Sequence, residues 1–206
     1  LFLDEAPEFP RQMLETLRQP LEDGLVTISR AVGSETFPAR MQLILSMNLC
    51  PCGRRGDPRR ACRCGEKQIL AYTGKISGPL LDRIDLHVEV PPVHHEKLME
   101  KRAGETSRQL RERVLAARRL QEKRYPGRAA PVNAAMTSRD METHCRLDGE
   151  SESVLRSAIA EYGLSARAYG RILKVARTIA DLDAAMDIGM EHLLEAVQYR
   201  RADNKN

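Results

Sequence analysis

In the first part of the chain, short apolar runs are separated by polar segments. Residues 1–3 (LFL) and 41–47 (MQLILSM) are nearly continuous apolar runs, which are typical of parallel strands covered on both faces. Residues 26–29 and 35–37 flank a glycine-containing turn and predict a β-hairpin. Residues 86–90 (LHVEV) alternate as a strand does before two prolines end the run. The pattern therefore predicts an α/β region up to about Val90.

Helical spacing of apolar residues appears first around residues 13–21. Pro20 predicts a kink in that helix, and Gly24 predicts its end. A short helical stretch is predicted at 68–72, and a longer one at 107–125 with one apolar face formed by Leu110, Val114, Ala117 and Leu120 or Gln121. Further helices are predicted near 138–145, 150–162, 165–182 and 189–199, with Ser138 and Ser165 as N-caps.

These patterns predict three regions. The first, 1–93, is a partial α/β core that includes a cysteine loop at 48–65. The second, 94–135, is a helix followed by a Pro/Gly/Ala-containing linker, and the third, 136–206, is all helical. No internal repeat is recognisable.

Composition narrows the class of protein. Hydrophobic residues make up 42% and charged residues 30% of the 206 residues, which indicates a soluble globular protein rather than a disordered one. No apolar run has the length that spans a bilayer, so no membrane partner is expected. The net charge of +4 suits a polyanionic partner but is also common among cytosolic enzymes. The missing initiator Met and export signal lead us to expect a fragment of a longer, cytoplasmic protein.

Asp4 and Glu5 directly follow the first apolar run. An acid at the end of a strand can hold Mg²⁺, and a second acid can polarise the water that attacks a γ-phosphate. The alternative is a strand that ends in two solvated acids. Asn48 follows the second apolar run and would lie at the same edge of a parallel sheet, where it could orient that water. By itself, an Asn in this position is usually a turn residue.

Arg83 lies between the small-residue turn Ser77-Gly78-Pro79 and the predicted strand at 86–90. An arginine in such a position can reach the phosphate of a neighbouring subunit. The alternative is an ion pair with Asp82, Asp85 or Asp4.

Four of the five cysteines form two C-x-C units, Cys50/Cys52 and Cys62/Cys64, separated by nine residues. Four thiolates at this spacing can enclose a tetrahedral Zn²⁺, and Gly53 and Gly65 would permit tight turns after each unit. Free or oxidised thiols are the alternative. Five arginines in the same loop also form a cationic surface, which could contact nucleic acid or remain solvated. Cys145 stands apart and is expected to be an ordinary thiol.

Several long runs of the sequence resemble the Mg-chelatase-like family of AAA+ ATPases, of the ComM type found in bacterial competence. More distantly, the chain is similar to magnesium-chelatase ATPase subunits and minichromosome-maintenance helicases. The runs that carry the resemblance are LFLDEAPEF (1–9), LRQPLEDG (17–24), TISRAVGSETFPAR (27–40), MNLCPCG (47–53), SGPLLDRIDLHVEVP (77–91) and LSARAYGRILKVARTIADL (164–182).

The resemblance implies a partial AAA+ parallel-sheet core followed by an all-α lid. It implies that Asp4 is the Walker B residue facing Mg²⁺ and Glu5 the catalytic base. Asn48 would be sensor 1, Arg83 the trans-acting arginine finger and Arg167 the sensor 2 arginine. The hairpin would project into the channel of a homo-oligomeric ring, a hexamer in the complete protein. Arg30 on it would contact DNA, or else be simply solvated.

One departure from the family is plain. Its phosphate-binding GxxxxGK[ST] motif precedes Walker B and does not occur in these 206 residues. ATP with Mg²⁺ is therefore expected to bind to the complete protein, and this chain alone is expected to be inactive.

The resemblance implies an ATPase that remodels DNA, as in helicase-type branch migration during natural transformation. One alternative is an ATPase acting in the insertion of Mg²⁺ into tetrapyrroles. Another is an interaction module stabilised by structural zinc, without an activity of its own.

Overall fold

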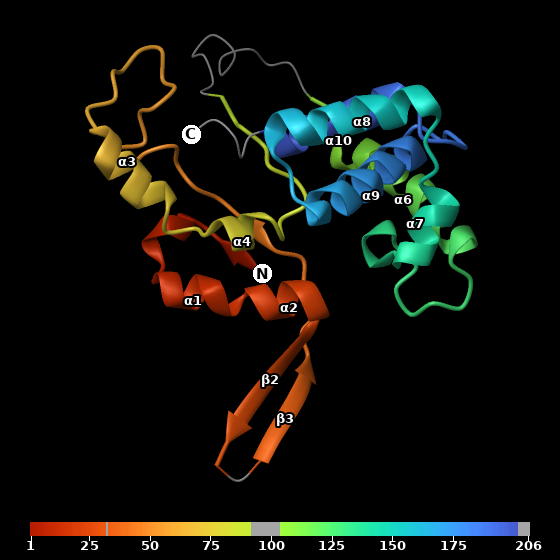
Figure 1. Cartoon of the computed structure of the whole chain (residues 1–206), viewed down its shortest axis with the longest axis horizontal. Coiled ribbons are helices and arrows are strands. Elements are labelled where there is room, and N and C mark those ends of the chain that lie inside the picture. Colours follow the sequence, from red (N-terminus) through yellow and green to blue (C-terminus); the bar gives the residue numbers. More distant parts are fainter. Residues whose placement is uncertain (32, 92–103, 202–206) are drawn as a thin grey trace. The chain divides into compact units, whose positions relative to one another are not determined.

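The computed structural model describes residues 1–31, 33–91 and 104–201. It divides into two compact units, which are described separately. Leu1–Ile84 form most of the first unit, and Asp85–Glu89 join the helices after residue 104 in the second (Figure 1). The predicted domain boundary at 93/94 lies outside the described residues.

The first unit contains a two-stranded parallel sheet. Strand β1 (Phe2–Leu3) pairs with β4 (Ile44–Leu45) in the register Phe2↔Ile44 and Leu3↔Leu45. Both strands are shorter than their apolar runs. The expectation that they would be covered on both faces is wrong, because Phe2 is 62% and Ile44 52% exposed. Among the described residues, this sheet has no third strand.

Two short helices lie between these strands, after the 3₁₀ turn η1 (Ala6–Glu8): α1 (Arg11–Thr16) and α2 (Arg18–Asp23). The predicted kink is confirmed at Leu17. Pro20 has no N–H to donate to the carbonyl of Thr16, so the helix is interrupted one turn before the proline. Gly24 ends α2 with φ +67°, as predicted. Leu14 on α1 packs with Leu3, Ala6, Ile76 and Leu80 in the core of this unit.

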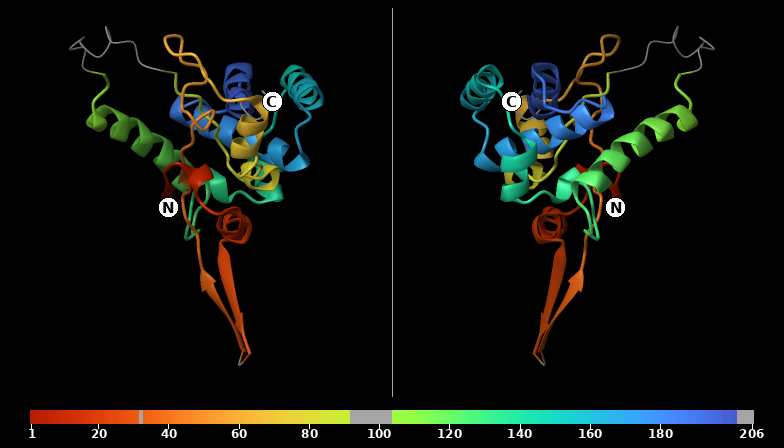
Figure 2. Two further views of the ribbon diagram at one scale, coloured as in Figure 1. Left: turned by 90° about the vertical axis from the view of Figure 1, so that its left-hand side faces the viewer. Right: turned by 90° about the vertical axis from the view of Figure 1, so that its right-hand side faces the viewer.

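The predicted hairpin is confirmed as β2 (Leu25–Arg30) and β3 (Gly33–Pro38), paired from Leu25↔Pro38 to Arg30↔Gly33. Gly33 belongs to a strand rather than to the turn, and Val32 lies outside the described residues. Hydroxyl pairs cross one face, Thr27 with Thr36 and Ser29 with Ser34, each at 3.0 Å. Within the first unit the hairpin extends away from α1 and α2 in both side views (Figure 2).

After β4, the chain forms the cysteine loop and then α3 (Glu66–Thr73) and α4 (Gly78–Leu81). The helix predicted at 68–72 is confirmed and is longer. The strand predicted at 86–90 is wrong, because these residues have no regular secondary structure and form no ladder with any other described residue. In the second unit, the N–H of His87 instead donates to the carbonyl of Tyr199 at 2.9 Å. Alternation alone cannot supply the partner strand that a ladder needs.

The second unit consists of helices, with one 3₁₀ turn. They are α6 (Ser107–Arg124), η2 (Asn133–Ala135), α7 (Ser138–His144), α8 (Gly149–Tyr162), α9 (Ala166–Leu182) and α10 (Met190–Arg201). The predicted helices agree to within a few residues. The expected face of α6 is only partly confirmed, because Ala117 and Gln121 are buried while Leu110 and Val114 are exposed.

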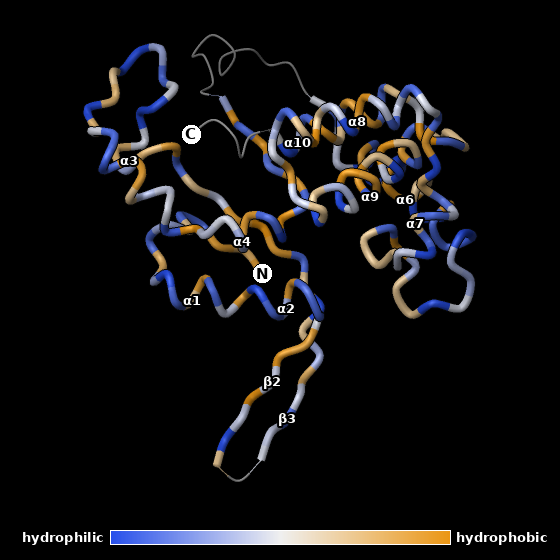
Figure 3. Tube along the Cα trace, in the orientation of Figure 1, coloured by the Kyte–Doolittle hydropathy of each residue, from blue (hydrophilic) through white to orange (hydrophobic). Residues whose placement is uncertain are grey.

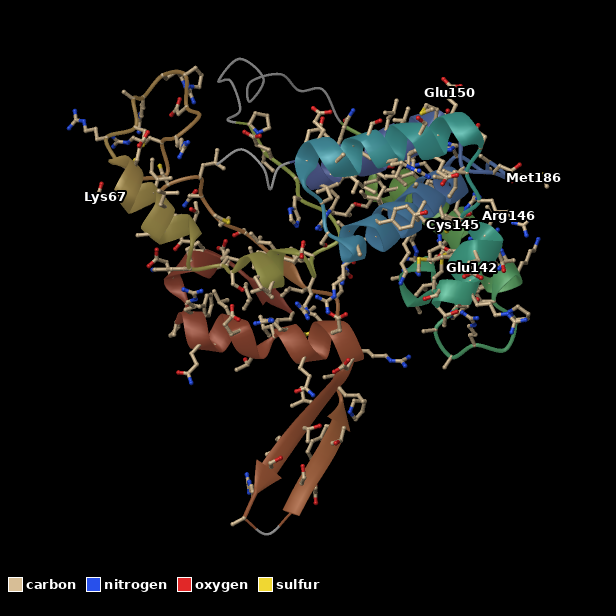
Figure 4. The ribbon with its side chains drawn as sticks, viewed as in Figure 1. Lys67, Glu142, Cys145, Arg146, Glu150 and Met186 are labelled. Carbon is tan, nitrogen blue, oxygen red and sulfur yellow. The ribbon has the colours of Figure 1, made fainter. Side chains whose placement is uncertain are left out.

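Helix α9 supplies the centre of this unit. Its buried residues recur every four positions, through Ala168, Ile172, Ala176 and Ala180, which gives the helix one continuous apolar face. Both apolar and polar residues occur along α9 (Figure 3). Cys145 is buried in the core, as expected, whereas Met186 projects outward and is 92% exposed (Figure 4). In the described part of the chain, no helix is both long and apolar enough to cross a membrane.

The predicted N-cap of α9 is confirmed, since the hydroxyl of Ser165 accepts from the N–H of Ala168 at 3.2 Å. The prediction of Ser138 as the cap of α7 is wrong by one residue. Thr137 accepts from the N–H of Asp140 at 3.3 Å, and the carboxylate of Asp140 accepts in return from the N–H and hydroxyl of Thr137.

Candidate functional site

The two acids after β1 lie at the edge of the parallel sheet where β4 also ends. The carbonyl of Leu3 accepts from the N–H of Ser46, and the carbonyl of Ser46 accepts from the N–H of Ala6, both at 2.9 Å. This ladder fixes the chain directly after each strand. Asp4 and Glu5 are exposed, so their carboxylates are accessible to a ligand.

Ser46 is a member of this site that the sequence did not single out. Its hydroxyl donates to Asp4 Oδ1 and also accepts from the N–H of Glu5 at 3.2 Å. A hydroxyl in this place orients the carboxylate that would face a cation. The available signal was its position, since Ser46 is the polar residue that directly follows Leu43-Ile44-Leu45 within the second apolar run.

Glu5 has a left-handed backbone conformation, with φ 51° and ψ 48°. A residue with a Cβ pays roughly 1 kcal/mol or more for this conformation. Glycine would remove that cost but would also remove the carboxylate. Backbone strain at a residue whose side chain is a predicted catalytic base is what a functional constraint would produce.

Asn48 lies two residues beyond Ser46 and is exposed. Burial raises the pKa of the Tyr72 phenol, and hydrogen bonds with the backbone and side chain of Asn48 oppose that rise. The carboxylates of Glu8 and Glu5 act on the same phenol and raise its pKa further. Tyr72, on α3, therefore joins the neighbourhoods of Asn48 and Glu5, a link that spacing along the chain does not reveal.

Arg83 is held within the first unit by an ion pair. Its Nε lies 2.8 Å from Glu22 Oε2, its Nη1 donates to the carbonyl of Pro79 at 2.7 Å, and its side chain is only 9% exposed. Glu22 is outside the three acids expected as alternative partners, and Asp85 pairs with Arg171 in the second unit. Arg83 borders a shallow groove of about 670 Å³ between α1, α2 and the base of the hairpin.

Arg167 occupies the first turn of α9 in the second unit and is exposed. Arg177, ten residues later in the same helix, is buried and was not singled out from the sequence. It donates to the carbonyls of Ala185 and Met186 at 2.7 and 2.8 Å and pairs with Asp181 at 3.1 Å. Arg177 thus ties the end of α9 to the loop before α10.

The structure brings the four cysteines of the loop together. Their sulfur atoms lie within 4.8 Å of one another, with Cys50–Cys52 at 3.4 Å, Cys50–Cys62 at 3.6 Å and Cys52–Cys62 at 3.7 Å. Zn–S bonds of about 2.3 Å in a tetrahedron place the sulfurs about 3.8 Å apart. The observed distances fit this geometry and are too long for disulfides.

The backbone of the loop is adapted to the sulfurs. Gly53 adopts φ +69° directly after the first cysteine pair, and its N–H donates to the carbonyl of Cys50 at 3.0 Å. Gly65 differs from the expectation, because it has φ −70° and forms the N-cap of α3. A hydrogen bond from the backbone of Arg54 is the largest of the effects that lower the pKa of Cys52 to about 6. Hydrogen bonding to Cys52, with burial, raises the pKa of Cys64 to about 12.

Comparison with known proteins identifies the family of the chain. The family profile described as magnesium chelatase, subunit ChlI, matches residues 1–98, and the profile of the ChlI C-terminal region matches residues 104–200. The chain belongs to the Mg-chelatase-like AAA+ family.

Among its relatives, the competence protein ComM of Haemophilus influenzae is 46% identical over 201 residues, which are 97% of this chain and 38% of ComM. The uncharacterized protein YifB of Escherichia coli is 42% identical over 206 residues, 98% of this chain and 39% of YifB. An uncharacterized protein of Mycobacterium tuberculosis is 36% identical over 201 residues, 98% of this chain and 39% of that protein. The chain thus spans about two fifths of the length of these relatives.

Proposed function

We propose that the complete protein carrying this chain is an AAA+ ATPase that forms a homo-oligomeric ring, a hexamer, and couples ATP hydrolysis to the remodelling of DNA. The observation that carries the proposal is the joint end of β1 and β4. There Asp4 is oriented by Ser46, and Glu5 is held in a left-handed conformation beside it. Membership of the family and the likeness to a competence protein support the choice of DNA as substrate.

In this proposal the residues have separate roles. Asp4, oriented by Ser46, would hold Mg²⁺ of the bound nucleotide, and Glu5 would accept a proton from the attacking water. Asn48 would orient that water. Arg83 would leave Glu22 and meet a nucleotide on a neighbouring subunit, and Arg167 would contact nucleotide as sensor 2. Arg30, exposed near the tip of the hairpin, would contact DNA phosphates.

The test is ATP hydrolysis by the complete protein, with and without forked or single-stranded DNA. Glu5→Gln should lower kcat by a factor of about 100 or more, because it removes the base and keeps the shape of the side chain. The matched control, Glu66→Gln, removes an exposed acid from the first turn of α3 and should leave kcat unchanged. DNA that neither stimulates hydrolysis nor is unwound would refute DNA remodelling and favour the magnesium-chelatase-like alternative.

The second part of the proposal is a structural zinc ion on Cys50, Cys52, Cys62 and Cys64. The sulfur positions fit a closed tetrahedral site, which leaves no position for a substrate. We expect one zinc per chain by elemental analysis and a tetrathiolate charge-transfer spectrum after substitution by cobalt. Cys52→Ser should lower metal content, whereas Cys145→Ser, a buried cysteine in the other unit, should not. Metal-free protein with unchanged thermal unfolding would contradict this role.

A further inference from the structure

The loop that holds the four cysteines is strongly cationic. Between Cys50 and Gly65 it contains five arginines and one acid, Asp57, with no lysine or glutamate. The arginines are Arg54, Arg55, Arg59, Arg60 and Arg63, and all five are exposed. We call this segment, residues 50–65, the arginine knuckle. Its excess of arginines over acids equals the net charge of the whole chain, +4.

The knuckle is an ordered platform, because its backbone is tied to the sulfur cluster and to its own turn. The N–H of Arg55 donates to Cys50 Sγ at 3.3 Å. The N–H of Asp57 donates to the carbonyl of Arg54 at 3.1 Å, and the carboxylate of Asp57 accepts from the N–H of Arg59 at 2.9 Å. Two arginine pairs, Arg54-Arg55 and Arg59-Arg60, therefore flank one fixed turn, and all four residues are exposed. Nitrogen-tipped side chains extend from this loop (Figure 4).

The single acid does not neutralise the platform. The hydrogen bond from the N–H of Arg59 is the largest of the effects that lower the pKa of Asp57. Asp57 Oδ1 also lies 3.7 Å from Arg59 Nε. Elsewhere in the first unit, two arginines are paired with acids: Arg18 with Glu15 and Arg83 with Glu22. Among the described residues, the other four arginines of the knuckle have no ion pair.

Zinc would leave the surface positive. A Zn²⁺ ion with four thiolates carries a net charge of about −2. That is half of the knuckle's excess positive charge, and it sits at the sulfurs, inside the turn. The guanidinium groups lie outside it, where an extended polyanion can reach several of them at once. Guanidinium groups bind phosphate oxygens through paired N–H donors, so closely spaced arginines suit a phosphodiester backbone.

We propose that the arginine knuckle is a binding surface for the phosphodiester backbone of nucleic acid, independent of base sequence. The inference rests on the proposed function, because it gives the DNA-acting protein a second contact besides the hairpin. No base-reading side chains are needed, since backbone contacts fix position and affinity without reading sequence. The cysteines hold the platform in place, and the arginines bind.

The test uses fluorescence anisotropy of a labelled single-stranded oligonucleotide, and of its duplex, with this chain and with the complete protein. The variant Arg54→Ala/Arg55→Ala/Arg60→Ala removes three cations and leaves the Asp57–Arg59 turn intact. Binding should weaken about tenfold or more at moderate salt. The slope of log K against log salt should fall by roughly two to three, about 0.7–0.9 for each lost phosphate contact.

The matched control removes the same charge from the second unit: Arg118→Ala/Arg119→Ala/Arg139→Ala, all exposed helical arginines. It should retain most of the affinity and slope. Replacing the three knuckle arginines with lysine should restore most of the slope and less of the affinity, and zinc content monitors folding of the loop. An equal loss in the control would overturn the inference, as would polyglutamate binding as tightly as DNA. If DNA stimulates ATP hydrolysis by the wild type and the knuckle variant binds the oligonucleotide as tightly as the wild type does, only this inference fails. If DNA does not stimulate hydrolysis by the wild type, the proposed function is refuted instead.

Discussion

The two units of the chain bury their apolar residues to very different degrees. In the helical unit, residues from α7, α8, α9 and α10 close around one core, and even a charged network is enclosed. In the first unit the core is small, and apolar residues of β1, β4 and the hairpin are exposed, among them Phe2, Ile44 and Phe37. An amphipathic helix can bury its face against helices nearby in sequence, whereas a strand depends on partners on both edges and both faces.

The buried charged network of the helical unit should give the largest effect. Asp181 accepts from Arg124 at 2.5 and 2.7 Å, from Arg177 at 3.1 Å and from Asn133 at 2.8 Å. Asp181→Asn would leave two guanidinium groups without their counter-charge. The free energy of unfolding should fall by about 3–5 kcal/mol, measured by urea denaturation. The control Asp187→Asn, at an exposed acid, should change it by less than about 0.5 kcal/mol.

The same network sets an acid limit on stability. Burial acts to raise the pKa of Asp181, but the hydrogen bonds from Arg124 and Asn133 outweigh it, so the pKa is lowered. A lowered folded-state pKa stabilises the unit above the unfolded-state value of about 3.9, and this contribution is lost as the pH falls below it. Wild type should lose stability below about pH 4, and Asp181→Asn should lose less over that range. Parallel acid titrations of the two proteins would contradict the assignment.

Substitutions in the small core of the first unit should give the next largest loss of stability. Leu14 is completely buried, so Leu14→Ala should lower the stability of that unit by about 2–5 kcal/mol. Phe2→Ala removes a larger side chain that is mostly exposed and should cost less than about 1 kcal/mol. Segment-resolved hydrogen exchange of α1 and α3 measures both. A similar loss for the two variants would show that β1 is covered in solution, which would weaken the contrast between the units.

The success of the sequence-based prediction in each region depends on whether a feature is set by neighbouring residues or by partners far along the chain. The helices of the second unit, the Pro20 kink and the Gly24 stop depend on local chemistry, and all were predicted. The coverage of β1 and β4 and the strand at 86–90 depend on partners that are not neighbours in sequence, and the described residues supply none, so these expectations were wrong. In the site, the spacing of the cysteines predicted their cluster. The Ser46–Asp4 and Arg83–Glu22 contacts could not be predicted, because no spacing rule joins residues 42 or 61 positions apart.

Substitution of Gly24 tests a feature that was predicted from local sequence, the end of α2. It ends α2 with φ +67°, and a Cβ there would lie 2.9 Å from Cγ of Arg40. Gly24→Ala should therefore lower stability by about 1–2 kcal/mol. Gly149→Ala places a methyl group in open space in the first turn of α8, where Ala is preferred, and should be neutral or slightly stabilising. Thermal unfolding of the two variants should therefore shift in opposite directions, or shift only for Gly24→Ala.

The smallest effect concerns the beginning of α7, where two adjacent hydroxyl residues compete for one role. Only Thr137 accepts from the N–H of Asp140, and its own N–H and hydroxyl both donate to the Asp140 carboxylate. Thr137→Ala should thus cost about 1 kcal/mol, while Ser138→Ala, at the first helical position, should change stability by less than about 0.5 kcal/mol. The reverse order would restore Ser138 as the cap. The expected order would instead confirm the one-residue error in the predicted cap. Such an error can occur even where the signal is wholly local, because two adjacent capping residues are distinguished only by the backbone conformation that each adopts.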